Sequence, residues 1–328
     1  ADPDVEEIWL TVYRVSRESK VLRALLDARK RGKDVRVFVE VKARFDEASN
    51  VAWADRLREA GVITFFSDTE LKVHAKIALV VRRNPDGGRT HLAFLGTGNF
   101  NEDPARFYTD FALLTADPRL TLEVEKVFHI LEGRIASADF ETLMVAPFTL
   151  RDRLVARIRE EADRAERGEP SGITLKMNAL EDEAMIRELL AAARSGVPVR
   201  GVIRGICRLA PTGPDAPAFA FRSILGRYLE HGRVYTFHGT GAEPDVYLAS
   251  ADWMHRNLTR RIEVAFPVLD PVLRDQVVEV VEMQLDDDHK GRLLDAEGRN
   301  AYPQPRPPGP GSQTRIRDRL ARLPPRST

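Results

Sequence analysis

A repeated pattern constrains the fold of this chain more than any other feature of its sequence. Arg14 aligns with Asn178 and Gly32 with Gly196 at one constant offset of 164 residues, without a gap. The stretch VLRALLDARKRGKDVRVFVE then aligns with MIRELLAAARSGVPVRGVIR, and in both a helical apolar spacing ends at a glycine before a second strand-like run. The order strand, helix, glycine, strand occurs twice, which predicts two copies of one α/β unit.

The first copy is predicted to hold a parallel sheet. Strands are expected at 8–15, 35–41 and 62–66, with helices at 21–31 and 51–61 between them. This order implies right-handed crossovers, and ligands of such sheets collect at the carboxyl ends of the strands. We also expect a hairpin with arms at 77–81 and 92–95, a strand at 106–115, and helices at 120–131 and 150–168.

The length of 328 residues is sufficient for two domains with hydrophobic cores. The predicted fold class is α/β, with two tandem domains related by internal duplication, at 1–140 and 141–296, and an active site in the cleft between them. The remainder, 297–328, contains the run YPQPRPPGPG and is expected to be a flexible tail, with a short basic helix at 314–323.

Each copy carries a histidine two residues before a cation. His74 precedes Lys76 in LKVHAK, and His231 precedes Arg233 in LEHGR. A lone histidine in a strand is more often a hydrogen-bonded structural residue than a catalyst, but its duplication favours catalysis. Because the unperturbed pKa of histidine is about 6.5, one imidazole can act as a neutral nucleophile and the other as a protonated donor. Pseudo-twofold pairing predicts that the two histidines share one cleft.

Arginines and a glycine-rich turn indicate phosphate as the ligand. Arg14 and Arg44 lie at or just after the ends of the first two predicted strands, and Arg204 ends the matching strand of the second copy. The turn GTGNFN, at 96–101, is expected near His74 with its backbone amides facing an anion. Guanidinium groups match phosphate oxygens bidentately and stay charged. Taken singly, either early arginine is more readily explained as a surface ion-pair residue.

Composition narrows the function classes. Lys+Arg and Asp+Glu both number 50, so no global field attracts a polyanion and a phosphate site must be built locally. The single cysteine, Cys207, rules out an intrachain disulfide and a Cys/His zinc cluster, while acidic Mg²⁺ ligands stay open. The sequence has no signal-peptide pattern and no apolar run near the ~20 residues of a membrane span. We expect a cytoplasmic protein, with peripheral membrane association as a variant.

Two copies with H-x-[KR] resemble the phospholipase D superfamily, whose motif is HxKxxxxD followed by a Gly/Ser-rich turn. In this chain the aspartate position is Val81 in the first copy and His238 in the second. The diesterase motif is therefore interrupted twice. The resemblance implies phospholipase D-like domains.

Longer strings resemble a second family more closely, the bacterial polyphosphate kinases in their C-terminal half. The resemblance covers roughly 4–270 in colinear order and rests on the strings TVYRVSRES, VKARFDEASN, LKVHAK, LGTGNFNEDPARFYTDFALLTADP, VIRGICRL, RSILGRYLEHGRVY and SADWMHRNLTRRIEV. It implies reversible transfer of the terminal phosphate of ATP to inorganic polyphosphate, with Mg²⁺ as cofactor.

The same resemblance implies roles for individual residues. His74 is implied to be the phosphohistidine nucleophile, with His231 assisting transfer opposite it. Arg14 and Arg44 are associated with phosphate and magnesium binding in the family, and Tyr108 and Arg204 with the nucleotide. Lys76, Arg233 and His231 are expected to contact phosphate or nucleotide as well.

The implied partners are ATP or ADP and inorganic polyphosphate, without nucleic acid, and the full-length form is expected to be a homo-oligomer with two further domains upstream. Two alternatives stay open at this stage. One is a phospholipase D-like phosphodiesterase, which the interrupted motif disfavours. The other is an inactive polyanion-binding fragment.

Overall fold

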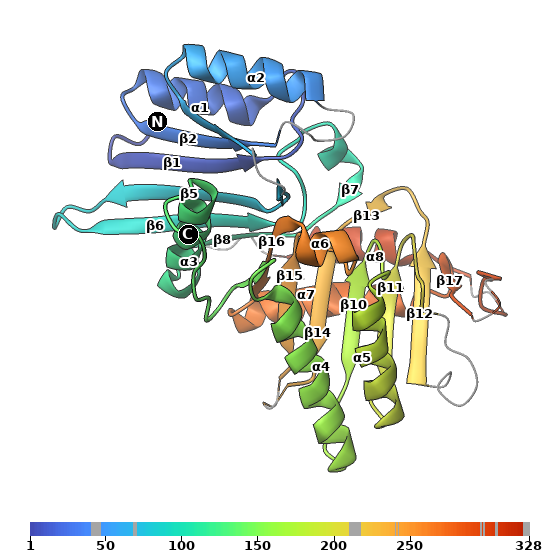
Figure 1. Cartoon of the computed structure of the whole chain (residues 1–328). Helices are drawn as coiled ribbons and strands as arrows, with labels where there is room; N and C mark the ends of the chain where they lie inside the picture. The colour runs from blue at the N-terminus through green and yellow to red at the C-terminus, as the bar shows by residue number, and fades with distance from the viewer. Residues whose placement is uncertain are drawn as a thin grey trace. The chain divides into compact units, whose positions relative to one another are not determined.

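The computed structural model describes residues 1–40, 47–67, 71–209, 218–239, 241, 243–295, 297, 299–305 and 308–323. Two β-sheet units organise the chain, and each is traced by its labels in Figure 1. Unit 1 comprises 1–153, 248–251 and 255–266, and unit 2 comprises 154–247, 252–254 and 267–328. Short pieces of the second sequence copy therefore belong to unit 1.

Unit 1 is built on a six-stranded sheet in the order β3-β2-β1-β5-β6-β8. Its elements are β1 (Val5–Val12), α1 (Lys20–Lys30), β2 (Asp34–Val39), α2 (Glu47–Glu59), β3 (Ile63–Phe66), β4 (Lys72–Val73), β5 (Lys76–Arg83), β6 (Arg89–Gly96), the 3₁₀ turn η1 (Pro104–Arg106), β7 (Tyr108–Thr109), β8 (Ala112–Thr115), α3 (Pro118–Leu131), β9 (Met144–Ala146), α6 (His255–Thr259) and nearly all of β16 (Arg261–Pro267).

Side-chain alternation along the strands gives this sheet two packed faces. On one face, Leu10 and Val37 join the buried residues of α1 and α2, among them Leu22 and Trp53. On the other face, Trp9 meets Phe128 of α3 edge to face, with ring centroids 5.5 Å apart. The core thus lies on both sides of the central strand β1.

Unit 2 repeats this design with a sheet in the order β17-β12-β11-β10-β14-β15. Its elements are most of α4 (Leu150–Glu166), β10 (Ile173–Met177), α5 (Glu183–Arg194), β11 (Val199–Ile203), β12 (Phe219–Ile224), β13 (Leu229–Glu230), β14 (Arg233–Phe237), most of β15 (Asp245–Ala249), α7 (Pro271–Leu285), β17 (Gly291–Leu293) and α8 (Ser312–Leu320).

The predicted α/β duplication is confirmed by the strand pairing. In unit 1, β2 runs parallel to β1 and β5 antiparallel to it, and in unit 2, β11 and β14 have the same relations to β10. At the offset of 164, α1 coincides with α5 and β2 with β11. Gly32 and Gly196, which end the two helices, share the left-handed conformation, with φ of 82° and 100°.

Two local expectations were wrong. His74 does not lie within a strand, because the amides of His74 and Ala75 both donate to the carbonyl of Ile262, at 3.0 and 2.9 Å, and this irregular pairing separates β4 from β5. The strand expected at 106–115 is broken into η1, β7 and β8. Thr97 causes the second break, since its amide donates to the carbonyl of Phe111 and its hydroxyl accepts from the amide of Phe111, both at 3.0 Å.

The described part of the tail contains the short helix that the sequence predicts at 314–323, as α8. Helix α8 is held at its first residue, because the amide of Ser312 donates to Oδ2 of Asp287 at 2.6 Å. Arg315 donates to the carbonyl of Met283 on α7 at 2.7 Å, and Arg319 pairs with Glu279. Polar contacts with α7 thus supply the anchorage that the Pro/Gly-rich composition conceals.

The helix-ending glycines give a stability prediction. A Cβ at Gly32 would meet no atom within 4 Å, so the cost of Gly32→Ala comes from its φ alone. Left-handed backbone costs an L-residue about 1 kcal/mol, and we expect urea denaturation to show a loss of about that size. Gly172→Ala is the matched control, since its Cβ would meet only Pro198, at 3.9 Å, without a positive φ. An equal loss in both variants would contradict the explanation.

Asp287 gives a pH prediction for α8. Burial alone raises the pKa of Asp287, but hydrogen bonds from Ser312, Lys290 and His289 outweigh it and hold this pKa below its usual value. A carboxylate with a lowered folded-state pKa stabilises the fold above its unfolded pKa of about 4, and the contribution is lost as pH falls through the lower folded value.

We therefore expect amide exchange of α8 to accelerate as pH falls below about 4, after correction for the intrinsic exchange rate. Asp287→Asn should show the faster exchange already at neutral pH. Asp318→Asn, which removes only an exposed ion pair with Arg317, should behave like wild type. Unchanged exchange in Asp287→Asn would show that this carboxylate does not hold the helix.

Candidate active site

Strand pairing places the side chain of His74 beside an acid from the distant end of the sequence. Strand β4 runs parallel to β16, with Lys72 opposite Arg261 and Val73 opposite Ile262. The next residue of β16 is Glu263, and His74 Nδ1 lies 2.8 Å from its Oε2. Both residues are buried, Glu263 completely.

Further donors surround the Glu263 carboxylate. The hydroxyl of Ser250 donates to Oε2 and the amide of Asn257 to Oε1. The guanidinium of Arg261 lies 3.8 Å from Oε1. Burial raises the pKa of Glu263, and the charges of Lys76 and Arg261 with these hydrogen bonds work against that rise. The net result is a raised pKa of Glu263. When Glu263 is ionised, its carboxylate can accept a proton held on His74 Nδ1, and the lone pair of a neutral imidazole is then on Nε2.

Tyr13 gathers three of the predicted site residues in unit 1. Its ring meets the His74 ring edge to face, with centroids 4.6 Å apart. Lys76 Nζ lies 5.2 Å and the Arg14 guanidinium 5.5 Å from the Tyr13 centroid. Lys76 also donates to the carbonyl of His74 and is buried. The structure thus brings Arg14, His74 and Lys76 together around Tyr13.

The glycine-rich turn forms part of a small pocket that contains Tyr108. A pocket of about 230 Å³ is lined by Gly98, Asn99, Tyr108 and Asp110, among others. The Thr97 hydroxyl donates to Asp110 Oδ1 at 2.6 Å, and a Cβ at Gly98 would collide with this carboxylate. Glycine is therefore required at 98 by the close approach of Asp110.

Two backbone amides of this turn already donate hydrogen bonds to carbonyl groups of the chain. Thr97 donates its amide to the carbonyl of Phe111, and Asn101 donates its amide to that of Asn99. An anion site made from the whole run of amides is therefore ruled out.

In unit 2, the backbone and ring of His231 are both in contact with Arg233. Arg233 Nη1 donates to the carbonyl of His231 at 2.9 Å and lies 3.4 and 3.2 Å from Nδ1 and Nε2 of its ring. The other guanidinium nitrogen donates to Asp252 at 3.0 Å. Asn178 donates to the same carbonyl at 3.2 Å. Arg204 directly follows β11, at the carboxyl end that the sequence predicts.

Sequence reasoning missed Glu263 and Ser250 as site residues. A second offset, 153, would have identified them, since it aligns the helix start Asp117-Pro118 with Asp270-Pro271. The same offset pairs Thr97 with Ser250 and Asp110 with Glu263. Both pairs make the same hydroxyl-to-carboxylate hydrogen bond. The signal was present but required aligning an aspartate with a glutamate.

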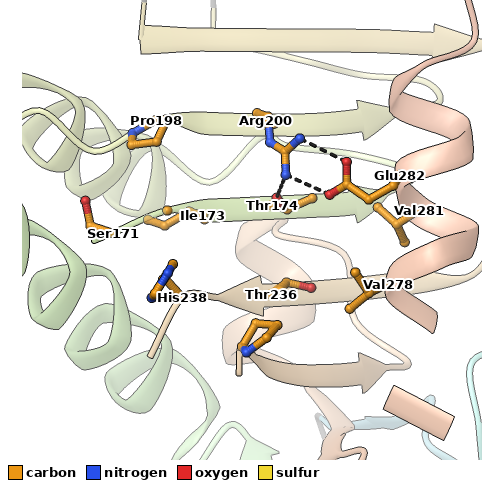
Figure 2. A pocket seen from close by; sticks show the side chains of 12 residues that line it. Ser171, Ile173, Thr174, Pro198, Arg200, Thr236, His238, Val278, Val281 and Glu282 are labelled. Carbon is orange, nitrogen blue, oxygen red and sulfur yellow. Dashed lines mark hydrogen bonds and ion pairs between the residues drawn. The ribbon is translucent and has the colours of Figure 1, made fainter. Parts of the chain in front are cut away.

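Other predicted residues lie elsewhere. Arg44 falls outside the described residues. Val81 is a buried residue of β5, and His238 follows the end of β14 opposite to Arg233. His238 instead lines a pocket of about 350 Å³ with Thr174, Arg200 and Glu282, which Figure 2 shows. Neither residue supplies the carboxylate of the diesterase motif.

The chemistry of the donor set argues against a magnesium ion ligated by the predicted arginines. Mg²⁺ requires oxygen ligands, and a guanidinium group is a cation with donors only. Within the described ranges, no group of three or more His, Cys, Asp or Glu side chains is arranged to hold a metal ion. A guanidinium group matches phosphate oxygens instead, so phosphate binding by Arg14 stays a prediction.

The helices were also compared with the requirements of a bilayer. Among those that the structure describes, none combines the length and the apolar character of a membrane-spanning helix.

Two family models match the chain. The model described as "Polyphosphate kinase C-terminal domain 1" matches residues 1–137, and "Polyphosphate kinase C-terminal domain 2" matches 143–312. The polyphosphate kinase of Escherichia coli (strain K12) is 45% identical over 322 residues, and that of Salmonella typhimurium (strain LT2) is 46% identical over 303 residues. These alignments cover 98% and 92% of this chain but 46% and 44% of the relatives. The chain thus spans about half the length of the curated relatives that it matches.

Solved structures agree with this relationship. The crystal structure of polyphosphate kinase from Porphyromonas gingivalis superposes with a TM-score of 0.90 at 39% identity, covering 98% of this chain and 49% of that chain. Phosphatidylserine synthase from Haemophilus influenzae Rd KW20 gives a TM-score of 0.55 at 11% identity, covering 96% and 88%. At that identity the second likeness shows the fold alone, and it agrees with the predicted fold class.

The role of Glu263 can be tested spectroscopically. In Glu263→Gln the negative charge that holds the proton on Nδ1 is lost, so we expect the ¹⁵N shifts of the His74 ring to change from one fixed tautomer to a mixture. Glu125→Gln is the matched control, because it removes a carboxylate 3.7 Å from another histidine of unit 1, His91. An unchanged His74 spectrum in Glu263→Gln would show that the tautomer is set elsewhere.

Proposed function

The chain belongs to the polyphosphate kinase family, and from this premise we propose that it forms the catalytic C-terminal half of an enzyme that transfers the terminal phosphate of ATP to inorganic polyphosphate. The observation that carries the proposal is the buried contact between His74 Nδ1 and Glu263 Oε2, at 2.8 Å. It supports a nucleophilic role for His74, because a carboxylate that holds the proton on Nδ1 makes Nε2 the reactive atom.

In the first step, Nε2 of His74 attacks the terminal phosphorus of ATP. The N–P bond forms as the bond from that phosphorus to the bridging oxygen breaks, and ADP departs with the bonding electrons. Phosphorylation of Nε2 leaves the ring cationic because Nδ1 keeps its proton. Glu263 then faces a positive charge at hydrogen-bond distance, which stabilises the intermediate in a site that is largely screened from water.

In the second step, the terminal oxygen of a polyphosphate chain attacks the same phosphorus. The N–P bond breaks, Nε2 regains its lone pair, and the polyphosphate is longer by one unit. In both steps the same phosphorus moves between the imidazole and a phosphate oxygen, and the oxygens of ADP and of polyphosphate are chemically similar. The sequence of steps is therefore chemically reversible, which supports transfer from polyphosphate to ADP as well.

The remaining site residues are proposed to bind the charged substrates. Arg14, Arg44, Lys76 and Arg204 supply cations for phosphate oxygens, which repel one another when two phosphate chains approach. Tyr108 is proposed to contact the nucleotide from the pocket beside the glycine-rich turn. His231, held at its carbonyl by Arg233, is proposed to donate a proton or hydrogen bond to the oxygen that leaves or attacks.

Mg²⁺ remains the proposed cofactor, as an ion that enters the site bound to ATP. The described residues hold no group of three or more His, Cys, Asp or Glu side chains that could bind it, and an ion carried by the phosphate oxygens of ATP satisfies its preference for oxygen ligands. The cytoplasmic location and the homo-oligomeric full-length form stay predictions.

His74→Ala tests the proposed nucleophile in the full-length gene product. After incubation with ATP and Mg²⁺, we expect intact-mass analysis to detect an acid-labile, alkali-stable phosphate in wild type and none in the variant. Polyphosphate synthesis should fall to background, because the variant lacks the imidazole that lies at hydrogen-bond distance from Glu263. His91→Ala, which removes a histidine of β6, should retain both signals.

Two outcomes would decide against the proposal. A normal turnover of His74→Ala would remove its nucleophilic role. Phosphodiester hydrolysis by wild type without any phosphoenzyme would favour the phosphodiesterase alternative.

A further inference from the structure

We propose that Gln313 on the C-terminal helix α8, acting with Gln284 and Lys176, is a positioning residue for His231. It binds the residues immediately before His231 and holds them at a buried glutamate. The inference rests on the proposed function in one respect, namely that His231 assists phosphoryl transfer. Nothing in the family-level assignment requires a role for α8.

The buried glutamate is Glu230, which ends β13 and directly precedes His231. Its Oε2 accepts from Lys176 Nζ at 2.8 Å and from Gln284 Nε2 at 2.7 Å. Its Oε1 accepts from Gln313 Nε2 at 2.7 Å. The three donors come from β10, α7 and α8, so one carboxylate joins three separate elements.

Gln313 also binds the backbone of Tyr228, two residues before Glu230. Its Nε2 donates to the carbonyl of Tyr228 at 2.8 Å, and its Oε1 accepts from the amide of Tyr228 at 3.0 Å. A Cβ at Gly226 would collide with the Gln313 amide, so glycine at 226 permits this approach. The chain is thus fixed at Tyr228, at Glu230 and at the carbonyl of His231, where Arg233 and Asn178 donate.

The first copy shows that the fold does not require this network. Lys176 corresponds to Val12 at the offset of 164, and Glu230 corresponds to Val73 at the offset of 157 that aligns His231 with His74; both valines are buried. A buried ion pair is often no more stabilising than apolar residues of similar size. Since the same fold accepts buried valines at both corresponding positions, stability alone does not account for the charged network of the second copy.

A positioning role accounts for the difference between the copies. If one hydrogen bond of a buried network is lost, a charge is left without compensation. The segment at 228–231 therefore has a strong preference for the geometry in which all the bonds are made. The main chain of His231 is then fixed before substrate binds. Displacements of about 1 Å at a reacting group can lower rates by about 10²-fold, so such fixation affects catalysis directly.

The test compares variants of the full-length protein at position 313. Gln313→Leu keeps the approximate side-chain size but removes the three hydrogen bonds that Gln313 makes with Tyr228 and Glu230. We expect turnover to fall about tenfold to hundredfold with little change in KM for ATP, and amide exchange at 226–232 to accelerate. Thr314→Ala is the matched control on the same helix, because the Thr314 side chain is exposed.

Gln313→Glu gives a readout that a merely structural role would not produce. It places a second carboxyl beside Glu230, and like charge raises the pKa of one member of such a pair. Its activity relative to wild type should therefore be greatest at low pH, where the shared proton restores the donor, and should decline as pH rises. The Leu variant should show no such recovery. If the activity of one Gln313→Glu sample rises and falls reversibly as pH is changed, the loss at higher pH is not caused by misfolding.

The outcomes distinguish the two levels of inference. If wild type transfers phosphate and both Gln313 variants match it in turnover and exchange, the positioning role is wrong while the proposed function stands. If wild type forms no phosphoenzyme and no polyphosphate, the proposed function fails. In that case the exchange data alone decide whether α8 orders the segment at 226–232.

Discussion

The burial of one carboxylate is the constraint on which the site in unit 1 depends. Glu263 has lost its contact with water, so its charge must be compensated by neighbouring groups, and His74, Ser250 and Asn257 all reach it. An isolated buried charge costs several kcal/mol, which makes the surrounding geometry difficult to change. The register of β4 with β16 is therefore needed to keep His74 beside the Glu263 charge, in addition to forming the strand pair.

Duplication provided two similar scaffolds that differ in their buried polar groups. Arg14 in the first copy corresponds to Asn178 in the second, and Asn178 binds the carbonyl of His231. Lys76 corresponds to Arg233, and each donates to the carbonyl of the histidine two residues earlier. This shared hydrogen bond explains the spacing H-x-[KR] in structural terms. The cation orients the main chain of its histidine, in addition to any contact with phosphate.

Local patterns predicted much of the fold and only part of the site. The offset of 164 located α1 and α5 correctly because helical apolar spacing and a helix-ending glycine are properties of neighbouring residues. Glu263 escaped prediction because it reaches His74 through a pairing between strands far apart in the sequence. Gln313 escaped prediction for a related reason. The Pro/Gly-rich segment before α8 indicates flexibility, and the three hydrogen bonds of Gln313 join residues far apart in the sequence.

The separation of His74 and Glu263 has a consequence for biosynthesis. The two residues are 189 positions apart. At ribosomal rates of about 5–20 residues per second, the acid emerges about 10 to 40 s after the histidine. During that interval the nascent chain carries the imidazole without the carboxylate that fixes its tautomer. Most of unit 1 can form its sheet in this time, but His74 gains its buried acidic partner only after 189 further residues have been made.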